Sequence, residues 1–231
     1  MSRTLNVVRM QLINRQTYIW VPLLVLGGAF VITLAIYMML SSAGVTGEKY
    51  GGGAQAPLWY FLFVGIQALV LTFPFSQAMS VTRRDFYLGT LVTASLTSLA
   101  LAAVFVIGGL LERATGGWGL NGFFFYMPWV WEAGPLAAGV IYFAVAMFFF
   151  VIGFWTATIY KRFGNLMLTV VLVGLGVIVV GLVWIVTATQ SWLAVWEGIL
   201  ALGALGLALW GLVAIAAMAA SSYLTLRRAT P

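Results

Sequence analysis

Few side chains in this chain of 231 residues can take part in acid–base, nucleophilic or metal chemistry. Cysteine and histidine are both absent, and only five residues are acidic. Without thiols and imidazoles the chain lacks a thiol nucleophile, an imidazole base and the usual ligands of zinc. We therefore predict that it carries no catalytic residue and no metal site.

A glycine-rich segment, GEKYGGG at residues 47–53, has the composition of a phosphate-binding loop but not its pattern. The P-loop requires G-x-x-x-x-G-K-S/T, whereas Lys49 here stands between Glu48 and Tyr50. The sequence contains no other nucleotide motif. We therefore expect no ATP or other cofactor to bind on this chain.

The polar side chains within apolar sequence are uncharged amides and hydroxyls. Candidates for lining a transport pathway are Gln67, Gln77, Thr90, Thr93 and Thr97, together with Pro74, which is expected to kink its helix. The alternative is that the hydroxyls bond to carbonyls of their own helix and that the proline affects packing only. No charged residue falls in the middle of an apolar run, which argues against a proton relay or a voltage sensor.

The elements that must hold these residues are long apolar helices. Apolar residues make up 63% of the chain and charged residues 7%, against roughly 25% charged residues in soluble domains. Six uncharged runs approach the roughly 20 residues that cross a membrane as a helix. They cover residues 19–40, 58–80, 89–111, 136–160, 165–187 and 198–226. We predict an all-α polytopic membrane bundle that forms a single domain over residues 1–231.

The basic residues predict the orientation of these runs. Nine of the eleven lie before the first run, after the last run, or in the second and fourth connections, whereas four of the five acidic residues lie in the other connections. By the positive-inside rule, both termini are therefore expected in the cytoplasm. This pattern explains the basic character without a nucleic-acid partner and predicts contacts with membrane lipid.

Three segments outside the six runs carry further expectations. Residues 1–17 predict a short interfacial helix with Leu5, Val8 and Leu12 on one side. Residues 41–57 predict a flexible exposed loop. The outer connection 112–135 is predicted to lie in the headgroup layer, the alternative being a role in substrate gating. Its aromatic residues are Trp118, Phe123, Phe124, Phe125, Tyr126, Trp129 and Trp131.

The segment SVTRRDFYLGT, residues 80–90, is the densest cytoplasmic feature. It is short, so we expect no more than one or two helical turns between two spans. Arg83, Arg84 and Asp85 are expected to face the cytosol and Phe86 the membrane. The segment is either a topology anchor or a surface on which a soluble partner docks.

Three features together resemble the membrane subunits of bacterial type-2 ATP-binding-cassette exporters. They are the six-span plan with basic termini, the segment RMQLINRQTYIWVPLL, and FPFSQAMSVTRRDFYLGTLVTASL followed by LLERATGGWG. The plan covers nearly the whole chain, and residues 73–119 carry most of the weight. The resemblance implies an N-terminal interfacial helix, here with Arg9 and Arg15. It also implies a coupling helix that meets the ATPase, here with Thr82, Arg83, Arg84, Asp85 and Phe86.

The resemblance further implies a permease subunit that is not itself an enzyme. Its partners would be a second permease chain, identical or different, and a cytoplasmic ATP-binding subunit that holds ATP and Mg. The expected location is the bacterial cytoplasmic membrane. Because no charge lies within the spans, a hydrophobic or amphiphilic substrate is favoured.

Other classes of membrane protein remain as alternatives. A non-transporting assembly or immunity factor would need no dedicated ATPase. An intramembrane enzyme would need carboxylates, histidine or a Ser–Lys pair at membrane depth, and the sequence places none there. A simple channel would be expected to show a charged or carbonyl-rich filter.

Overall fold

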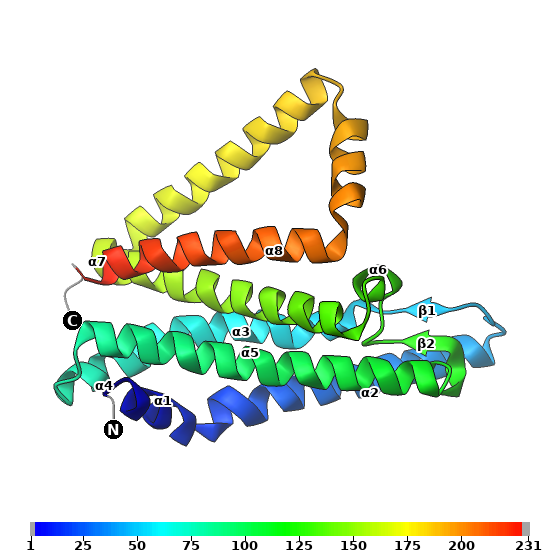
Figure 1. Cartoon of the computed structure of the whole chain (residues 1–231), viewed down its shortest axis with the longest axis horizontal. Helices are drawn as coiled ribbons and strands as arrows, with labels where there is room; N and C mark the ends of the chain where they lie inside the picture. The colour runs from blue at the N-terminus through cyan, green and yellow to red at the C-terminus, as the bar shows by residue number, and fades with distance from the viewer. Residues whose placement is uncertain (1–2, 228–231) are drawn as a thin grey trace.

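The computed structural model describes residues 3–227 (Figure 1). This part of the chain is helical apart from its connections and one short pair of strands. In chain order the elements are α1 (Arg3–Ile13), a π-helical turn (Gln16–Trp20), α2 (Val21–Ser42), β1 (Lys49–Tyr50), a 3-10 turn (Gly52–Gln55), α3 (Ala56–Gln67), a second π-helical turn (Ala68–Thr72), α4 (Phe73–Ala78), α5 (Arg83–Ala114), an irregular turn (Gly117–Asn121), β2 (Gly122–Phe123), α6 (Pro128–Trp131), α7 (Pro135–Ala188) and α8 (Trp192–Leu226).

Five helical stretches are long and apolar enough to cross a membrane. They are Gln16–Ser42, Gly52–Ala78, Arg83–Ala114, Pro135–Ala188 and Trp192–Leu226. The first two are continuous through their π-helical turns, so α3 and α4 belong to one stretch. The coarser prediction, an all-α protein with several helices of membrane-spanning length, is therefore confirmed.

Two of these stretches are broken at a glycine. Gly164 interrupts α7 with φ 81° and ψ −179°, and Gly203 interrupts α8 with φ 61° and ψ 176°. This region of backbone space is essentially restricted to glycine, so the two residues fix where the helices break. An unbroken α7 of 54 residues would be about 80 Å long, far more than a bilayer requires.

The break at Gly164 sends the chain away from the rest of the bundle. Residues 165–188 leave as a helix, the chain turns, and the second part of α8 returns to run beside the first part of α7 (Figure 1). No residue from 160 to 203 is buried. This excursion therefore takes no part in the core.

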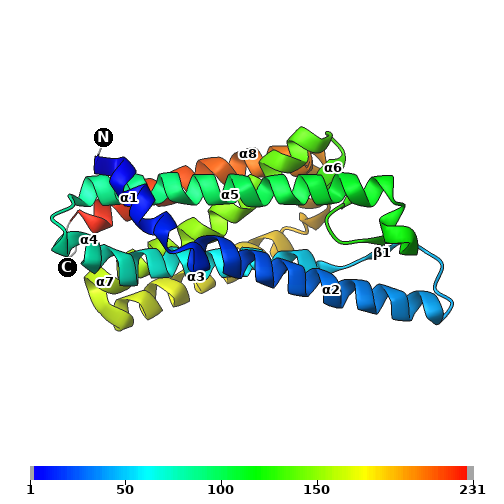
Figure 2. The ribbon, with the colours of Figure 1, turned by 90° about the horizontal axis from the view of Figure 1, so that it is seen from below.

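The N-terminal helix lies across the start of α5 (Figure 2). Its buried residues are Val7, Val8 and Gln11, whereas Leu5 is half exposed. The predicted apolar side of Leu5, Val8 and Leu12 is therefore wrong in part. Packing against α5 selects the buried face, and a helix lying only on a membrane surface would have no such constraint.

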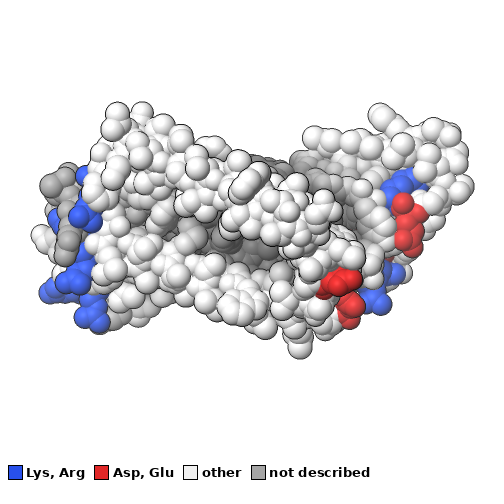
Figure 3. Space-filling model, turned by 90° about the horizontal axis from the view of Figure 1, so that it is seen from above, with Lys and Arg blue, Asp and Glu red and all other residues white. Residues whose placement is uncertain are grey.

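The two ends of the bundle differ in charge (Figure 3). One end, named the basic end here, contains the beginning of α1 and the end of α8. It also holds the basic residues at positions 83, 84, 161, 162 and 227. The opposite end, named the cap end, holds the connections of residues 43–55 and 115–134. There β1 pairs with β2 in parallel, with Lys49 opposite Gly122.

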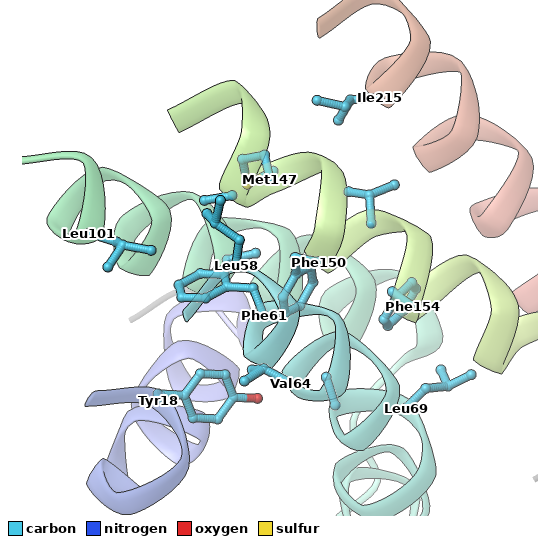
Figure 4. Packing of buried hydrophobic residues seen from close by; sticks show 14 of the residues in the cluster. Tyr18, Leu58, Phe61, Val64, Leu69, Leu101, Met147, Phe150, Phe154 and Ile215 are labelled. Atoms are coloured by element: carbon cyan, nitrogen blue, oxygen red, sulfur yellow. The ribbon is translucent and has the colours of Figure 1, made fainter. Parts of the chain in front are cut away.

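The core lies between α3, α5 and the first part of α7. Phe61 and Val64 of α3 lie close to Phe150 of α7 in the centre of the buried cluster (Figure 4). Gly65 and Gly153 let these two helices touch, because a Cβ at either position would run into the backbone of the other helix. The bundle thus depends on close helix packing, as membrane helices commonly do.

Candidate functional site

Thr82 sets the start of α5 at the basic end. Its backbone is extended (φ −70°, ψ 150°), and its hydroxyl oxygen accepts a hydrogen bond from the Asp85 backbone N–H at 3.1 Å. The same hydroxyl donates to Asp85 Oδ2 at 2.6 Å. This reciprocal pattern is a helix N-cap with an acidic residue in the first turn.

The cap changes the expected shape of this segment. Arg83 to Phe86 form the first turn of a 32-residue helix, and the connection from α4 is reduced to residues 79–82. The separate short helix expected between two spans is therefore not formed. The apolar run predicted from residue 89 is part of a helix that already begins at Arg83. Six residues are missed because the first turn of this helix is charged and lies outside the apolar run.

The two adjacent arginines have different surroundings. Arg83 donates from Nη1 to the carbonyl oxygen of Arg227 at 2.9 Å and to that of Leu226 at 3.5 Å. A cation is favourable there, because the last carbonyls of a helix carry partial negative charge. Arg84 is exposed and makes no hydrogen bond within the described residues. Arg83 therefore joins α5 to the end of α8, whereas Arg84 faces outward.

The next two side chains extend this junction into the core. Phe86 is completely buried, with its ring 5.1 Å from that of Phe73 in α4. The Tyr87 hydroxyl donates to the Ala219 carbonyl at 2.7 Å, and its ring lies 5.0 Å from that of Tyr223. Phe86 therefore makes an internal contact, and its expected exposure at a membrane or partner surface is not seen.

Helix α1 completes the junction from the other side. Gln11 Nε2 donates to Thr90 Oγ1 at 2.8 Å, and Thr4 Oγ1 donates to Asp85 Oδ1 at 3.3 Å. Of the two cations predicted for this helix, Arg9 is exposed on α1, and Arg15 lies beyond its end and is also exposed. The first two turns of α5 thus contact α1, α4 and α8 together.

Three of the six predicted pathway residues make local contacts. Thr93 and Thr97 donate to the Gly89 and Thr93 carbonyls at 2.9 Å, which is the back-bonding that the alternative interpretation describes. Gln77 Nε2 donates to the Val81 carbonyl at 3.0 Å. Thr97 also lines an apolar cleft of about 280 Å³ between α2 and α5.

Three further candidates do not converge on that cleft. Thr90 is buried against α1, Gln67 is half-buried, and Pro74 is exposed. The predicted irregularity at Pro74 is a π-helical turn over Ala68–Thr72, just before the proline. Proline has no N–H to donate, so a widened turn ahead of it keeps the helix continuous.

A second cluster lies at the cap end around Glu112, which is completely buried in α5. Its Oε1 accepts hydrogen bonds from the Trp118 indole and the Phe124 backbone N–H, both at 2.8 Å. Its Oε2 accepts from the backbone N–H groups of Phe125 and Tyr126, both at 2.8 Å. One carboxylate therefore holds the outer connection against the end of α5, and each bond is charge-assisted.

Residues 124–126 return to Glu112 through a turn with left-handed backbone angles. Gly116, Gly117, Trp118 and Gly119 all have positive φ, which reverses the chain and returns residues 122–126 over α5. Phe124, Phe125 and Trp131 are buried as a result, and the aromatic connection folds into the protein. These three rings therefore pack inside the protein, whereas Trp129 is exposed, and the headgroup location of the connection stays a prediction.

Lys49 fastens the other outer connection to the same cap. It is only 6% exposed, and its Nζ donates to the Leu120 carbonyl at 2.8 Å and to Ser41 Oγ at 3.1 Å. The Tyr37 hydroxyl adds a bond to the Phe123 carbonyl at 2.9 Å. Of the connection 41–57, predicted as a flexible exposed loop, residues 42–48 and Tyr50 are exposed as expected, whereas Lys49 is buried and fixed to the other connection.

Tyr50 lies at the exposed edge of this cap. Its hydroxyl donates to Glu48 Oε2 at 2.6 Å, and this hydrogen bond raises the pKa of Tyr50 to about 12. The carboxylate favours the protonated phenol because the anion would lose the bond and be repelled. Tyr50 therefore stays protonated at neutral pH and remains the donor in this bond.

Sequence reasoning missed Glu112 and Lys49, because both stand beside glycine-rich loops and read as ordinary surface charges. The available signal was the glycine cluster at residues 116–119 between an acidic residue and an aromatic run. Among residues 3–227, no group of three or more acidic, histidine or cysteine side chains could hold a metal ion.

Comparisons of this chain with protein-family models, with curated proteins and with solved structures give no significant match. The junction at the basic end joins α5 to α1, α4 and α8, and it presents the exposed cation Arg84 at the surface.

Proposed function

We propose that this chain is a permease subunit of an ATP-binding-cassette exporter, driven by a separate ATPase that docks at the basic end. The observation that supports this most is the junction at the start of α5. Arg83, Phe86 and Tyr87 connect this helix start to α8 and α4, and Gln11 connects it through Thr90 to α1. A force applied there acts on several membrane helices together.

The proposed topology has six crossings of a bacterial cytoplasmic membrane. Gly164 would divide α7 into two crossings, so that residues 165–188 return to the outer side. The basic end would then face the cytoplasm with both termini, in accordance with the positive-inside rule. The cap end, which holds the buried Glu112, would close the outer side.

In this mechanism Arg84 and the exposed side of α1 meet the ATPase. ATP and Mg are held by that partner, and the permease unit is completed by a second permease chain, the same or different. Docking biases the bundle between two arrangements through its different affinity for each, so no catalytic group is needed on this chain. A hydrophobic or amphiphilic substrate is proposed, since charged side chains are confined to the ends of the spans.

The first test is to purify the tagged chain from its native membrane in mild detergent, identify co-purifying proteins by mass spectrometry and assay ATP hydrolysis. A co-purifying protein with Walker motifs and vanadate-sensitive activity would support the proposal. A chain that emerges alone, or with a partner that is no ATPase, would instead favour a non-transporting assembly or immunity factor.

Charge reversal at Arg84 tests the docking surface without disturbing the core. The variant Arg84→Glu should lose most of the co-purifying ATPase, and Arg83→Glu with Arg84→Glu should lose it together with transport. Lys161→Glu is the matched control, because it reverses a charge at the same end but outside the junction. Normal ATPase binding and transport by a correctly inserted double variant would refute the assignment.

A further inference from the structure

A small polar cavity lies at the basic end, outside the α5 junction. It has a volume of about 370 Å³ and is lined by Arg162, Leu224, Thr225 and Arg227. Arg162 comes from the last turn of the first part of α7, and Arg227 follows the end of α8. The cavity therefore lies between the end of the first part of α7 and the end of α8.

Both guanidinium groups of this cavity lie over aromatic rings. The Arg162 guanidinium is 4.5 Å from the Phe163 ring centroid, and that of Arg227 is 5.9 Å from the Tyr223 ring centroid. Such cation–π contacts restrict the long side chains. The two planar groups are thus partly pre-organised for an anion with several oxygens, which guanidinium groups bind in bidentate fashion.

The positive charge of the cavity is not neutralised by the described chain. Among residues 3–227, no carboxylate lies within ion-pair distance of Arg162 or Arg227. Asp85 is the acidic residue of this end, and it is already bonded to Thr82 and Thr4. The last carbonyls of α8 contribute partial negative charge, but they are bound by Arg83.

Apolar side chains flank the cavity on the surface. Leu224 is 60% exposed and Phe163 is 47% exposed, and no residue of the neighbouring stretch 160–203 is buried. Guanidinium groups next to exposed apolar side chains at the end of a spanning helix lie where a membrane changes from hydrocarbon to headgroups. The ligand of this cavity therefore meets apolar surface on one side and water on the other.

We infer that this cavity binds the phosphate headgroup of an anionic phospholipid. Its volume corresponds to roughly a dozen water molecules, at about 30 Å³ each, which leaves room for a phosphate and its glycerol. The acyl chains would lie along the exposed side of Leu224 and Phe163. The bound lipid would join the end of the first part of α7, next to the break at Gly164, to the end of α8.

The inference relies on the proposed orientation for one point only, the assignment of the lipid to the inner leaflet. It does not depend on transport or on an ATPase. A binding measurement on the purified chain therefore tests it alone, and a failure of the exporter proposal leaves its result unchanged.

Native mass spectrometry of the purified chain, with added phosphatidylglycerol or phosphatidylcholine, is the direct experiment. The wild-type chain should bind phosphatidylglycerol at least about tenfold more tightly than phosphatidylcholine. The double variant Arg162→Gln with Arg227→Gln should lose about tenfold in affinity for phosphatidylglycerol. The control is Lys161→Gln with Arg84→Gln, which removes the same charge from the same end and should bind normally. Equal loss in both variants would show general charge attraction and overturn the inference.

One additional arm distinguishes a phospholipid from a free phosphate compound. Soluble glycerol 3-phosphate at millimolar concentration should leave the lipid bound; if it displaces the lipid, the site is one for free phosphate compounds. Unchanged lipid binding by the Arg162 and Arg227 double variant, correctly folded by circular dichroism, would overturn the assignment to a lipid.

Discussion

Val7 of α1 lies directly over Gly89 of α5, and a Cβ added at position 89 would stand 2.6 Å from the Val7 Cβ. Real side chains do not approach so closely, so a larger residue would have to move one helix. The contact is one turn from the Gln11–Thr90 hydrogen bond. The absence of a side chain at position 89 therefore sets the position of α1 on α5.

Replacing Gly89 by alanine should push α1 away from α5. We expect a loss of about 1–3 kcal/mol in stability and faster amide exchange over residues 3–13, because overpacked contacts force backbone shifts. Thermal unfolding in detergent and hydrogen-exchange mass spectrometry measure both effects. Gly28→Ala is the matched control, since no atom lies within 4 Å of a Cβ there. Wild-type exchange in α1 of the Gly89→Ala variant would contradict the prediction.

Replacing Glu112 by glutamine should open the outer cap. The amide side chain keeps one acceptor oxygen and brings two N–H groups to a site that already holds four donors. Unsatisfied buried N–H groups cost about 1–3 kcal/mol each, so we expect a loss on the order of 3 kcal/mol. Exchange of the Phe125 and Tyr126 amides should rise strongly.

Glu132→Gln is the control for the Glu112 variant. Glu132 is exposed at the same end of the bundle, so the change removes the same charge without touching the buried carboxylate. Its stability and its amide exchange at residues 124–126 should match the wild-type chain. If both variants behaved alike, surface charge and not the four buried hydrogen bonds would explain the effect.

The sequence was informative wherever composition alone decides the structure. Uncharged runs of about 20 residues can satisfy their backbone in lipid only as helices, so the helical class followed directly. It was less informative at the ends of helices. Arg83, Arg84 and Asp85 are predicted in a separate helical turn or two between two spans, yet the Thr82 cap makes them the first turn of α5.

The buried cap could not be predicted for a different reason. Glu112 and Lys49 are separated by more than sixty residues, and their burial depends on how two connections fold against each other. Local composition predicts loops in both places. Only the returning path of residues 122–126 supplies the N–H groups that make a buried carboxylate favourable.

Replacing Arg83 by glutamine should loosen the end of α8. The variant loses the hydrogen bonds from Arg83 to the Leu226 and Arg227 carbonyls, for an expected cost of about 1 kcal/mol. Exchange of amides in the last turn of α8 should increase. Arg84→Gln, its neighbour without an internal hydrogen bond, should leave that exchange unchanged. Identical exchange in the two variants would show that Arg83 does not hold this helix end.

The break at Gly164 predicts that the two ends of the helix 165–188 are reached from opposite sides of the membrane. The chain has no cysteine, so single cysteines introduced at Phe163, Thr189 and Val45 report position without a background. All three sites are exposed. A membrane-impermeant maleimide applied to intact cells should label positions 45 and 189, and should reach position 163 only after permeabilisation.

This labelling pattern follows from length. Residues 165–188 form a helix of about 36 Å, enough to cross the roughly 30 Å of hydrocarbon once. If that helix instead lay on the membrane surface, positions 163 and 189 would react from the same side, and the chain would cross five times. A reversal of all three accessibilities would keep six crossings but place the basic end outside. Labelling of positions 45 and 189 in intact cells, with position 163 labelled only after permeabilisation, is therefore the result that requires both the break at Gly164 and a cytoplasmic basic end.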